Sequence, residues 1–351
     1  MDTQERDRLI GLIIGHVADY RQDEIPRVDA ARVLSWLQQF EDNDRPIILV
    51  ETERMLSKTY ISRARAKSFI ERLAANEELA GDSPKDFWKA VGFLGLQSGS
   101  RSQTDMLTLL DEVLADKFGL STASENSVNN TYVYLDDVSF SGNQIKNDLL
   151  QWFEQNKIKD ANVQVIVIGV YAYGEYYAKR ELRKAFNQRN TRLKFWASVR
   201  IENSPNRVKD AGVLWPTQLP NEKYVKQWEA TLAPHKDYFI PRPPDGAAST
   251  RLFTSEANRE VVEQAFLKKG AYIFSLPKNP QASMRPLGFS ALRTPGFGAT
   301  LITYRNCPNN APLVLWWGDP EGSAPLNQWT PLLQRRPRAR GPGADSDVTD
   351  L

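Results

Sequence analysis

Residues 132–144 read Tyr132-Val133-Tyr134-Leu135-Asp136-Asp137-Val138-Ser139-Phe140-Ser141-Gly142-Asn143-Gln144. An apolar strand over 132–135 is followed by two adjacent carboxylates and then by a short loop, rich in serine and glycine, that opens a helix. Open α/β sheets place their ligands beyond the carboxyl ends of the strands. We therefore expect Asp136 and Asp137 to face a ligand at the edge of a parallel sheet.

The residue types in this run suit a sugar phosphate. Carboxylates accept hydrogen bonds from vicinal ribose hydroxyls, while loop N–H groups and the positive end of a helix attract a 5′-phosphate. Ser139 and Ser141 add hydroxyl donors, and Gly142 has no Cβ to block close approach. Two other interpretations of the acidic pair stay open: a Mg²⁺ site for phosphoryl transfer, and a structural cap on the next helix.

The sequence on both sides of this run alternates short apolar segments with amphipathic helices, which is typical of a parallel α/β sheet. We expect strands at 91–96, 132–135, 163–171 and 193–201, and helices at 104–118, from 143 onward and at 175–186. A second small-residue loop, Gln97 to Ser102, follows the first of these strands. The core of the fold is therefore predicted over residues 86–203.

The first 85 residues predict a helical N-terminal segment. Leu9, Ile13, Val17 and Tyr20 recur three or four positions apart, which places them on one helix face. Asp29 is a natural N-cap for a second helix.

Residues 204–334 predict a C-terminal hood subdomain that contains strands. A helix is expected at 256–268, and strand-like pieces are expected at 271–276, 298–304 and 313–317. The tail, 335–351, is rich in arginine and proline and has no apolar anchor, so we expect it to be disordered.

Composition limits the classes of protein. The 351 residues contain 45 Lys+Arg and 43 Asp+Glu, a net charge of +2, so bulk charge points to no polyanionic partner. Hydrophobic residues make up 41%, which is typical of a folded globular chain. Cys307 is the only cysteine, which excludes an intramolecular disulfide and, with two histidines, a Cys/His zinc site.

The sequence favours a cytoplasmic protein. Its first residues lack the basic and apolar parts of a signal peptide. Its most apolar segment, 163–170, includes Gln164 and is far shorter than the roughly 20 apolar residues of a membrane helix. Neither the P-loop motif, nor the three-glycine dinucleotide motif, nor H-E-x-x-H, nor G-x-S-x-G is present.

Residues 132–144 resemble the phosphoribosyl pyrophosphate (PRPP) motif of type I phosphoribosyltransferases, with Ser141-Gly142 in the place of the usual Thr-Gly. The resemblance implies a type I phosphoribosyltransferase-like parallel sheet core. It also implies that Asp136 and Asp137 are catalytic residues that contact the ribose hydroxyls. The 5′-phosphate loop would comprise Ser139, Phe140, Ser141, Gly142, Asn143 and Gln144.

The upstream loop matches a second feature of that family. By resemblance, Ser98, Gly99, Ser100 and Arg101 would hold pyrophosphate. Mg²⁺ would reach the site through bound PRPP, whose oxygens it prefers, and no metal site made by the protein is expected.

Three departures separate the chain from the classical enzymes. The connection from Ser121 to Asn130 is short and lacks the Lys and Arg of the family's mobile loop. Phe140 stands where purine-specific members often carry a carboxylate, which disfavours purine salvage. Gln144 replaces the commoner Thr.

As a whole, the chain resembles large phosphoribosyltransferase-like proteins of bacterial conflict systems, including antiphage cassettes, some of them next to retron reverse transcriptases. The features that carry this resemblance are the helical front, residues 135–142, and residues 309–317. It implies a defence effector that acts at ribose C1, by transfer or by N-glycosidic cleavage. The alternative is a catalytically silent PRPP or nucleotide sensor that regulates a partner protein or nucleic acid. No membrane partner is expected.

Overall fold

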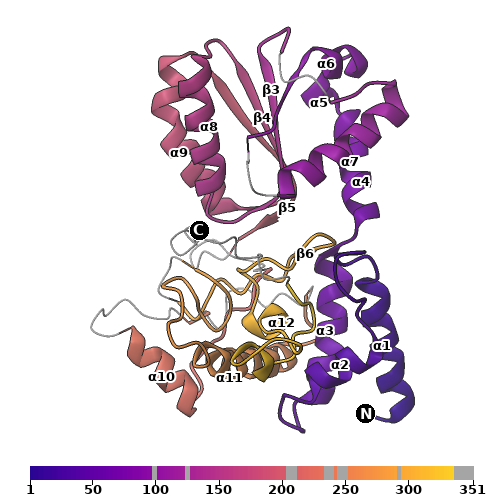
Figure 1. The fold of residues 1–351 in the computed structure, drawn as a ribbon, viewed down its shortest axis with the longest axis vertical. Helices are drawn as coiled ribbons and strands as arrows, with labels where there is room; N and C mark the ends of the chain where they lie inside the picture. The colour runs from indigo at the N-terminus through magenta and orange to yellow at the C-terminus, as the bar shows by residue number, and fades with distance from the viewer. Residues whose placement is uncertain are drawn as a thin grey trace. The chain divides into compact units, whose positions relative to one another are not determined.

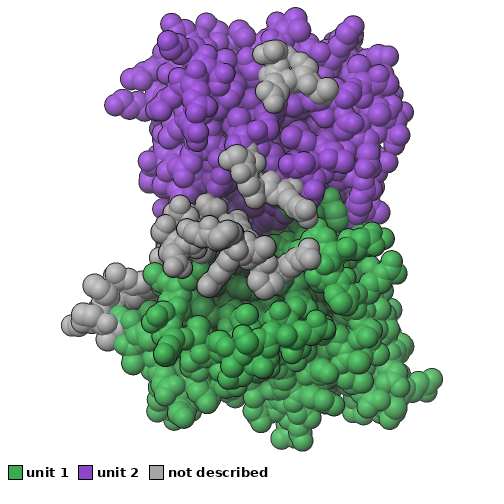
Figure 2. Space-filling view, viewed as in Figure 1, with its two compact units in different colours: residues 1–62, 202–349 green, residues 63–201, 350–351 purple. Residues whose placement is uncertain are grey.

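A computed structural model describes residues 1–96, 101–122, 127–202, 212–232, 241–242, 252–290 and 294–335. The chain divides into two compact units, coloured separately in Figure 2. Unit 1 contains residues 1–62 and the described residues from 202 onward, and unit 2 contains residues 63–201. Unit 2 is therefore one continuous piece of chain, whereas unit 1 is built from two pieces that lie far apart in the sequence.

A parallel sheet of four strands forms the centre of unit 2. The strands are β2 (Gly92–Leu94), β3 (Thr131–Ser139), β4 (Asn162–Tyr171) and β5 (Arg192–Ile201), and they lie in the order β2-β3-β4-β5. All three pairings are parallel. The predicted parallel α/β core is confirmed, and β3, which carries the acidic pair, lies between β2 and β4.

Helices cover both faces of this sheet. They are α4 (Arg63–Ala74), α5 (Glu77–Ala80), α6 (Pro84–Ala90), α7 (Arg101–Phe118), α8 (Asn143–Asn156) and α9 (Ala172–Gln188). In Figure 1, α8 and α9 lie on one side of the sheet and α4 to α7 on the other. Trp152 and Phe153 of α8 and Phe186 of α9 pack with buried valines of β4.

Unit 1 joins the N-terminal helices to the second half of the chain. Its elements are α1 (Thr3–His16), α2 (Ala30–Leu37), α3 (Arg45–Thr59), β1 (Tyr60–Ile61), α10 (Lys223–Thr231), α11 (Glu256–Phe274), β6 (Ile302–Thr303), α12 (Leu313–Trp316) and the 3-10 helix η1 (Leu326–Gln328). The strands β1 and β6 pair in parallel. One hydrophobic core contains residues from 9–60 and from 214–333. Asp29 caps α2 as predicted, because its carboxylate accepts the N–H of Arg32 at 2.8 Å.

Two of the three strand predictions for the hood are wrong. Residues 271–274 continue α11, and residues 313–316 form one turn of helix, α12. Only the segment 298–304 contains a strand, β6. A short apolar run does not by itself distinguish a strand from a buried helix. Gly270, which suggests a helix end in the sequence, lies inside α11, where a Cβ would meet the Pro286 carbonyl oxygen at 2.3 Å.

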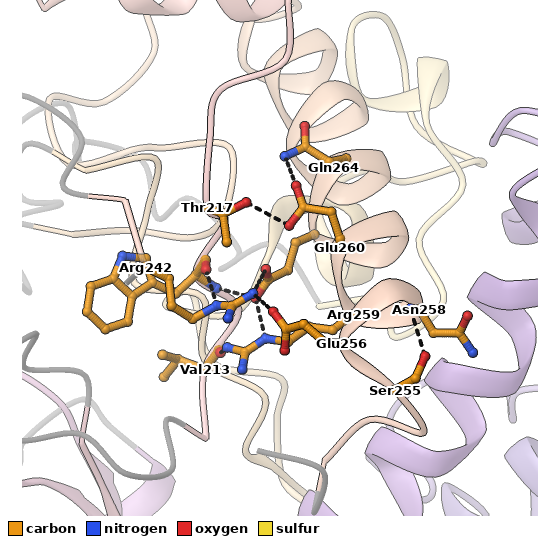
Figure 3. A network of polar contacts seen from close by, with 11 residues as sticks. Val213, Thr217, Arg242, Ser255, Glu256, Asn258, Arg259, Glu260 and Gln264 are labelled. Atoms are coloured by element: carbon orange, nitrogen blue, oxygen red, sulfur yellow. Dashed lines mark hydrogen bonds and ion pairs between the residues drawn. The ribbon is translucent and has the colours of Figure 1, made fainter. Parts of the chain in front are cut away.

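A buried ionic network attaches α11 to the segment around Trp215 (Figure 3). Glu263 is fully buried and accepts from Arg259 at 2.9 Å, from the Trp215 N–H at 2.7 Å and from Arg242 at 3.3 Å. Arg242 also pairs with Glu256 and donates to the Trp215 carbonyl at 2.9 Å. Two buried guanidinium groups therefore depend on one buried carboxylate for much of their charge compensation.

Among the described residues, none of the helices combines the length and the apolar character needed to cross a membrane.

Candidate functional site

The acidic pair lies inside the last part of β3. The strand continues to Ser139, four residues beyond the predicted end, with Asp136 opposite Val167 and Ser139 opposite Val170 in β4. The parallel pairing with β4 holds this end of the strand extended, although aspartate disfavours strands. The pair therefore sits on a rigid element close to the carboxyl edge of the sheet.

The two carboxylates differ in their surroundings. Asp136 is buried, with 7% of its surface exposed, whereas Asp137 is half-buried. Successive strand residues point to opposite faces of a sheet. Tyr134, two residues before Asp136, donates its hydroxyl to Asp148 of α8 at 2.7 Å. By this alternation Asp136 lies on the α8 face and Asp137 on the opposite face.

Each of these carboxylates also accepts a hydrogen bond from the backbone N–H of the following residue. Asp136 Oδ1 accepts the N–H of Asp137 at 2.8 Å, and Asp137 Oδ1 accepts the N–H of Val138 at 2.7 Å. An asparagine at either position keeps a side-chain oxygen for this bond but loses the negative charge. Asp→Asn is therefore the substitution that tests charge with the least disturbance of the strand.

The loop after β3 turns directly into α8. Gly142 is the N-cap of α8 and has a left-handed conformation, with φ +74°. The hydroxyl of Ser141 accepts the Asn143 N–H at 3.2 Å, and Gln144 donates to Asp148 at 2.7 Å. The loop thus presents backbone groups at the positive end of a helix of 14 residues, which is where anions bind favourably.

A second glycine, Gly174 in the first turn of α9, fixes the position of this loop. A Cβ on Gly142 would lie 2.2 Å from the carbonyl oxygen of Gly174, and a Cβ on Gly174 would lie 1.9 Å from the carbonyl oxygen of Phe140. The two backbones are therefore in direct contact. Packing of the loop against α9 by itself requires Gly142 to be a glycine.

Next to Gly174 lies a charged cluster that the sequence analysis missed. Glu175 is buried, receives a hydrogen bond from Lys179 at 2.6 Å, and pairs with Arg200 near the end of β5. Burial tends to raise the pKa of the Glu175 carboxyl, but the hydrogen bonds from Arg200 and Lys179 outweigh it and lower that pKa. The only sequence signal for this cluster is the four-residue spacing of Glu175 and Lys179.

The predicted pyrophosphate loop is mostly outside the described residues. Ser98, Gly99 and Ser100 fall in the gap between 96 and 101, and Arg101 is the first residue of α7. The described residues contain no group of three or more His, Cys, Asp or Glu side chains that could hold a metal ion. Asp136 and Asp137 do supply hard carboxylate oxygens, the donor type that suits Mg²⁺.

Comparison with family models identifies the chain. The PRTase-CE family model matches residues 33–335, which include most of unit 1 and all of unit 2. The chain belongs to the PRTase-CE family and is a phosphoribosyltransferase-like protein, as the motif over 132–144 predicted. Comparison with curated proteins gives no significant match, and comparison with solved structures gives none.

Proposed function

We propose that the protein binds the ribose 5-phosphate unit of PRPP or of a nucleotide at the loop between β3 and α8. The observation that carries this proposal is the acidic pair at the carboxyl end of a central parallel strand, followed at once by the glycine-capped helix α8. This arrangement occurs in a chain of a phosphoribosyltransferase-like family. Both the motif and its position in the sheet support the same ligand.

Different residues of the proposed site contact different parts of the ligand. Asp136 and Asp137 accept hydrogen bonds from the ribose hydroxyls, and the loop 139–144 binds the 5′-phosphate through backbone N–H groups and serine hydroxyls. The segment 98–101 is the proposed contact for pyrophosphate. Mg²⁺, bound together with PRPP, would supply positive charge that offsets the charge of the pyrophosphate.

The proposed chemistry is substitution at ribose C1. In transfer, an acceptor nitrogen forms a bond to C1 while the bond from C1 to pyrophosphate breaks and pyrophosphate leaves with the electron pair. In N-glycosidic cleavage, a water oxygen forms a bond to C1 while the bond from C1 to the base nitrogen breaks, and the base leaves with the electron pair and takes up the proton that water loses. Both routes develop positive charge at C1, which the carboxylates of Asp136 and Asp137 and the bound phosphates stabilise.

We further propose that this activity serves bacterial antiphage defence in the cytoplasm, on the resemblance of the whole chain to conflict-system proteins. A partner protein or nucleic acid would then control it. A second candidate function is a catalytically silent sensor of PRPP or nucleotide. The short connection from Ser121 to Asn130, without Lys or Arg to shield the reaction from water, favours that candidate.

Titration calorimetry with PRPP and Mg²⁺ tests the ligand. We expect wild-type protein to bind, and Asp137→Asn and Asp136→Asn each to weaken binding roughly 10- to 100-fold, because each loses a charge-assisted hydrogen bond. Asp86→Asn, an exposed aspartate of α6 in the same unit, is the matched control and should bind like wild type. Equal binding by all four proteins would exclude the ribose-phosphate assignment.

The same proteins separate enzyme from sensor. Wild type is incubated with PRPP, Mg²⁺ and a mixture of nucleobases, and in parallel with a mixture of nucleotides, and the products are followed by mass spectrometry. Loss of substrate that depends on Asp137 supports the enzyme. Binding without any change of PRPP or nucleotides supports the sensor.

A further inference from the structure

Two exposed aromatic rings stand on the first turns of α9. Tyr173 and Tyr176 expose 54% and 53% of their surface, and of the large hydrophobic side chains exposed in the described part of the chain only these two are aromatic. Their ring centroids lie 6.0 Å apart. Adjacent aromatic rings exposed to water are a recurrent feature of surfaces that bind nucleic-acid bases. The face of α9 that carries the two tyrosines is therefore a candidate binding surface.

The next two turns of this helix carry positive charge. The exposed cations are Lys179, Arg180, Arg183 and Lys184. The two acidic residues of α9 are both paired: Glu175 is buried against Lys179 and Arg200, and Glu181 pairs with Arg180 at 2.8 Å. The Arg180 guanidinium lies 5.9 Å from the Tyr176 ring centroid. The exposed face thus runs from aromatic rings to cations within three turns.

We propose that this face of α9 binds single-stranded nucleic acid. Unpaired bases stack on aromatic side chains, and flanking Lys and Arg bind the phosphates. Positions 173, 176, 180 and 183 follow helical spacing, so two tyrosines and two arginines form one stripe that is roughly 15 Å long at 1.5 Å per residue. The stripe combines both elements of single-strand recognition on one rigid helix.

Other partners fit this stripe less well. A helix that docks into a protein groove presents apolar residues at successive turns, but Arg180 and Arg183 occupy those places here. A nucleic-acid duplex covers the faces of its bases, so it would use the cations and leave the rings unused. Only a ligand with both exposed bases and phosphates uses the whole stripe.

The position of α9 adds to this argument. Gly174, between the two tyrosines, is in backbone contact with the loop after β3. The first turn of α9, which carries Tyr173, is therefore next to the proposed ribose-phosphate loop in the fold. The inference does not depend on that function, since an oligonucleotide assay measures the α9 surface and PRPP calorimetry measures the loop.

Fluorescence anisotropy of the full chain with labelled oligothymidylate and oligouridylate tests the proposal, and binding of either supports it. We expect Tyr173→Ala/Tyr176→Ala to weaken binding roughly 10- to 100-fold, because stacking contributes to binding at each base. Tyr173→Phe/Tyr176→Phe keeps both rings and should bind like wild type. Circular dichroism confirms that each variant is folded.

The contribution of the exposed cations of α9 is measured separately, through the salt dependence of binding. Arg183→Ala/Lys184→Ala should reduce the slope of log K against log salt by about 1.4, because two phosphate contacts are lost on a single strand. Lys85→Ala/Lys89→Ala, two exposed lysines of α6 in the same unit, should leave the slope unchanged. The proposal is wrong if wild type does not bind either oligonucleotide at low salt. It is also wrong if the Tyr→Ala variant loses affinity for heparin, a polyanion without bases, as strongly as for oligonucleotide.

Discussion

Close backbone contact holds the loop after β3 against α9. At Gly142 and Gly174 the space that a Cβ would need is occupied by carbonyl groups of the other segment. Real Cβ atoms do not approach carbonyl oxygens to about 2 Å, so any side chain at either glycine must push the loop away from α9. The candidate phosphate loop therefore owes its shape to a residue 32 positions further along the chain.

Gly174→Ala should lower the free energy of unfolding by about 2–3 kcal/mol, the range of an overpacked site, as measured by urea denaturation. Gly11→Ala is the matched control. Gly11 lies in α1 with open space at its Cβ position, and alanine favours helix, so this variant should be as stable as wild type or slightly more stable. If both variants have the same stability, the contact between the two glycines is not tight.

At this scale the sequence predicts which residues form the candidate site better than it predicts why they are there. The sequence predicts Asp136, Asp137 and Gly142 as one unit, and in the structure this unit lies at the carboxyl end of β3, an inner strand of the parallel sheet. The part that Gly142 plays in packing cannot be predicted from the sequence, because its contact with Gly174 exists only after the sheet forms. Arg200 joins Glu175 for the same reason, since β4 and β5 are neighbours only in the folded sheet.

Among the elements of unit 1, α11 combines packing in the hydrophobic core with a buried ionic network. Replacing one partner of a buried ionic network leaves the remaining charges without compensation, which typically costs about 3–5 kcal/mol. In this helix Glu263 serves both Arg259 and Arg242, and it also accepts the backbone N–H of Trp215. Glu263 is therefore the charged centre of the attachment of residues 212–217 to α11, which Arg259 and Glu260 complete through Val213 and Thr217.

Glu263→Gln should lower the free energy of unfolding by about 3 kcal/mol, because the amide keeps the shape but not the charge that balances two buried arginines. Glu260→Gln provides the comparison on the same helix. Glu260 is half-exposed and accepts from the neutral groups of Thr217 and Gln264, so its loss of charge should cost less than about 1 kcal/mol. Equal losses in chemical denaturation would show that the network is not the main attachment.

Element prediction was most accurate where the pattern is regular. The strand β4 is buried along nearly all of its length, and its continuous apolar run predicts it. The prediction of a strand at 271–276 is wrong, because α11 is surrounded by core on most sides and its sequence therefore shows little amphipathic periodicity. A helix buried in this way resembles a strand in sequence, and only its packing reveals the difference.

On the scale of the whole molecule, the two units differ in how the chain builds them. The sheet of unit 2, with helices α8 and α9 and the core between them, lies within residues 63–201. The N-terminal helices of unit 1 instead bury their apolar side chains against residues from the second half of the chain.

We therefore expect a fragment of residues 63–201 to fold on its own and to unfold cooperatively in urea, as followed by circular dichroism. A fragment of residues 1–62 should show no cooperative transition, because it lacks the partners of its apolar faces. A 63–201 fragment that melts gradually would show that unit 2 needs unit 1 for its stability.

The pairing of β1 with β6 joins Tyr60 to Ile302. During synthesis at about 5–20 residues per second, the ribosome needs on the order of 10–50 s to add the roughly 240 residues between them. Helices α1 to α3 emerge first, but their packing partners α11 and β6 are synthesised only at the end of this interval. Unit 2, which lies between them in the sequence, has all of its own residues earlier and can fold. The nascent chain thus exposes the apolar faces of its earliest helices for longest, and these are where chaperones would bind.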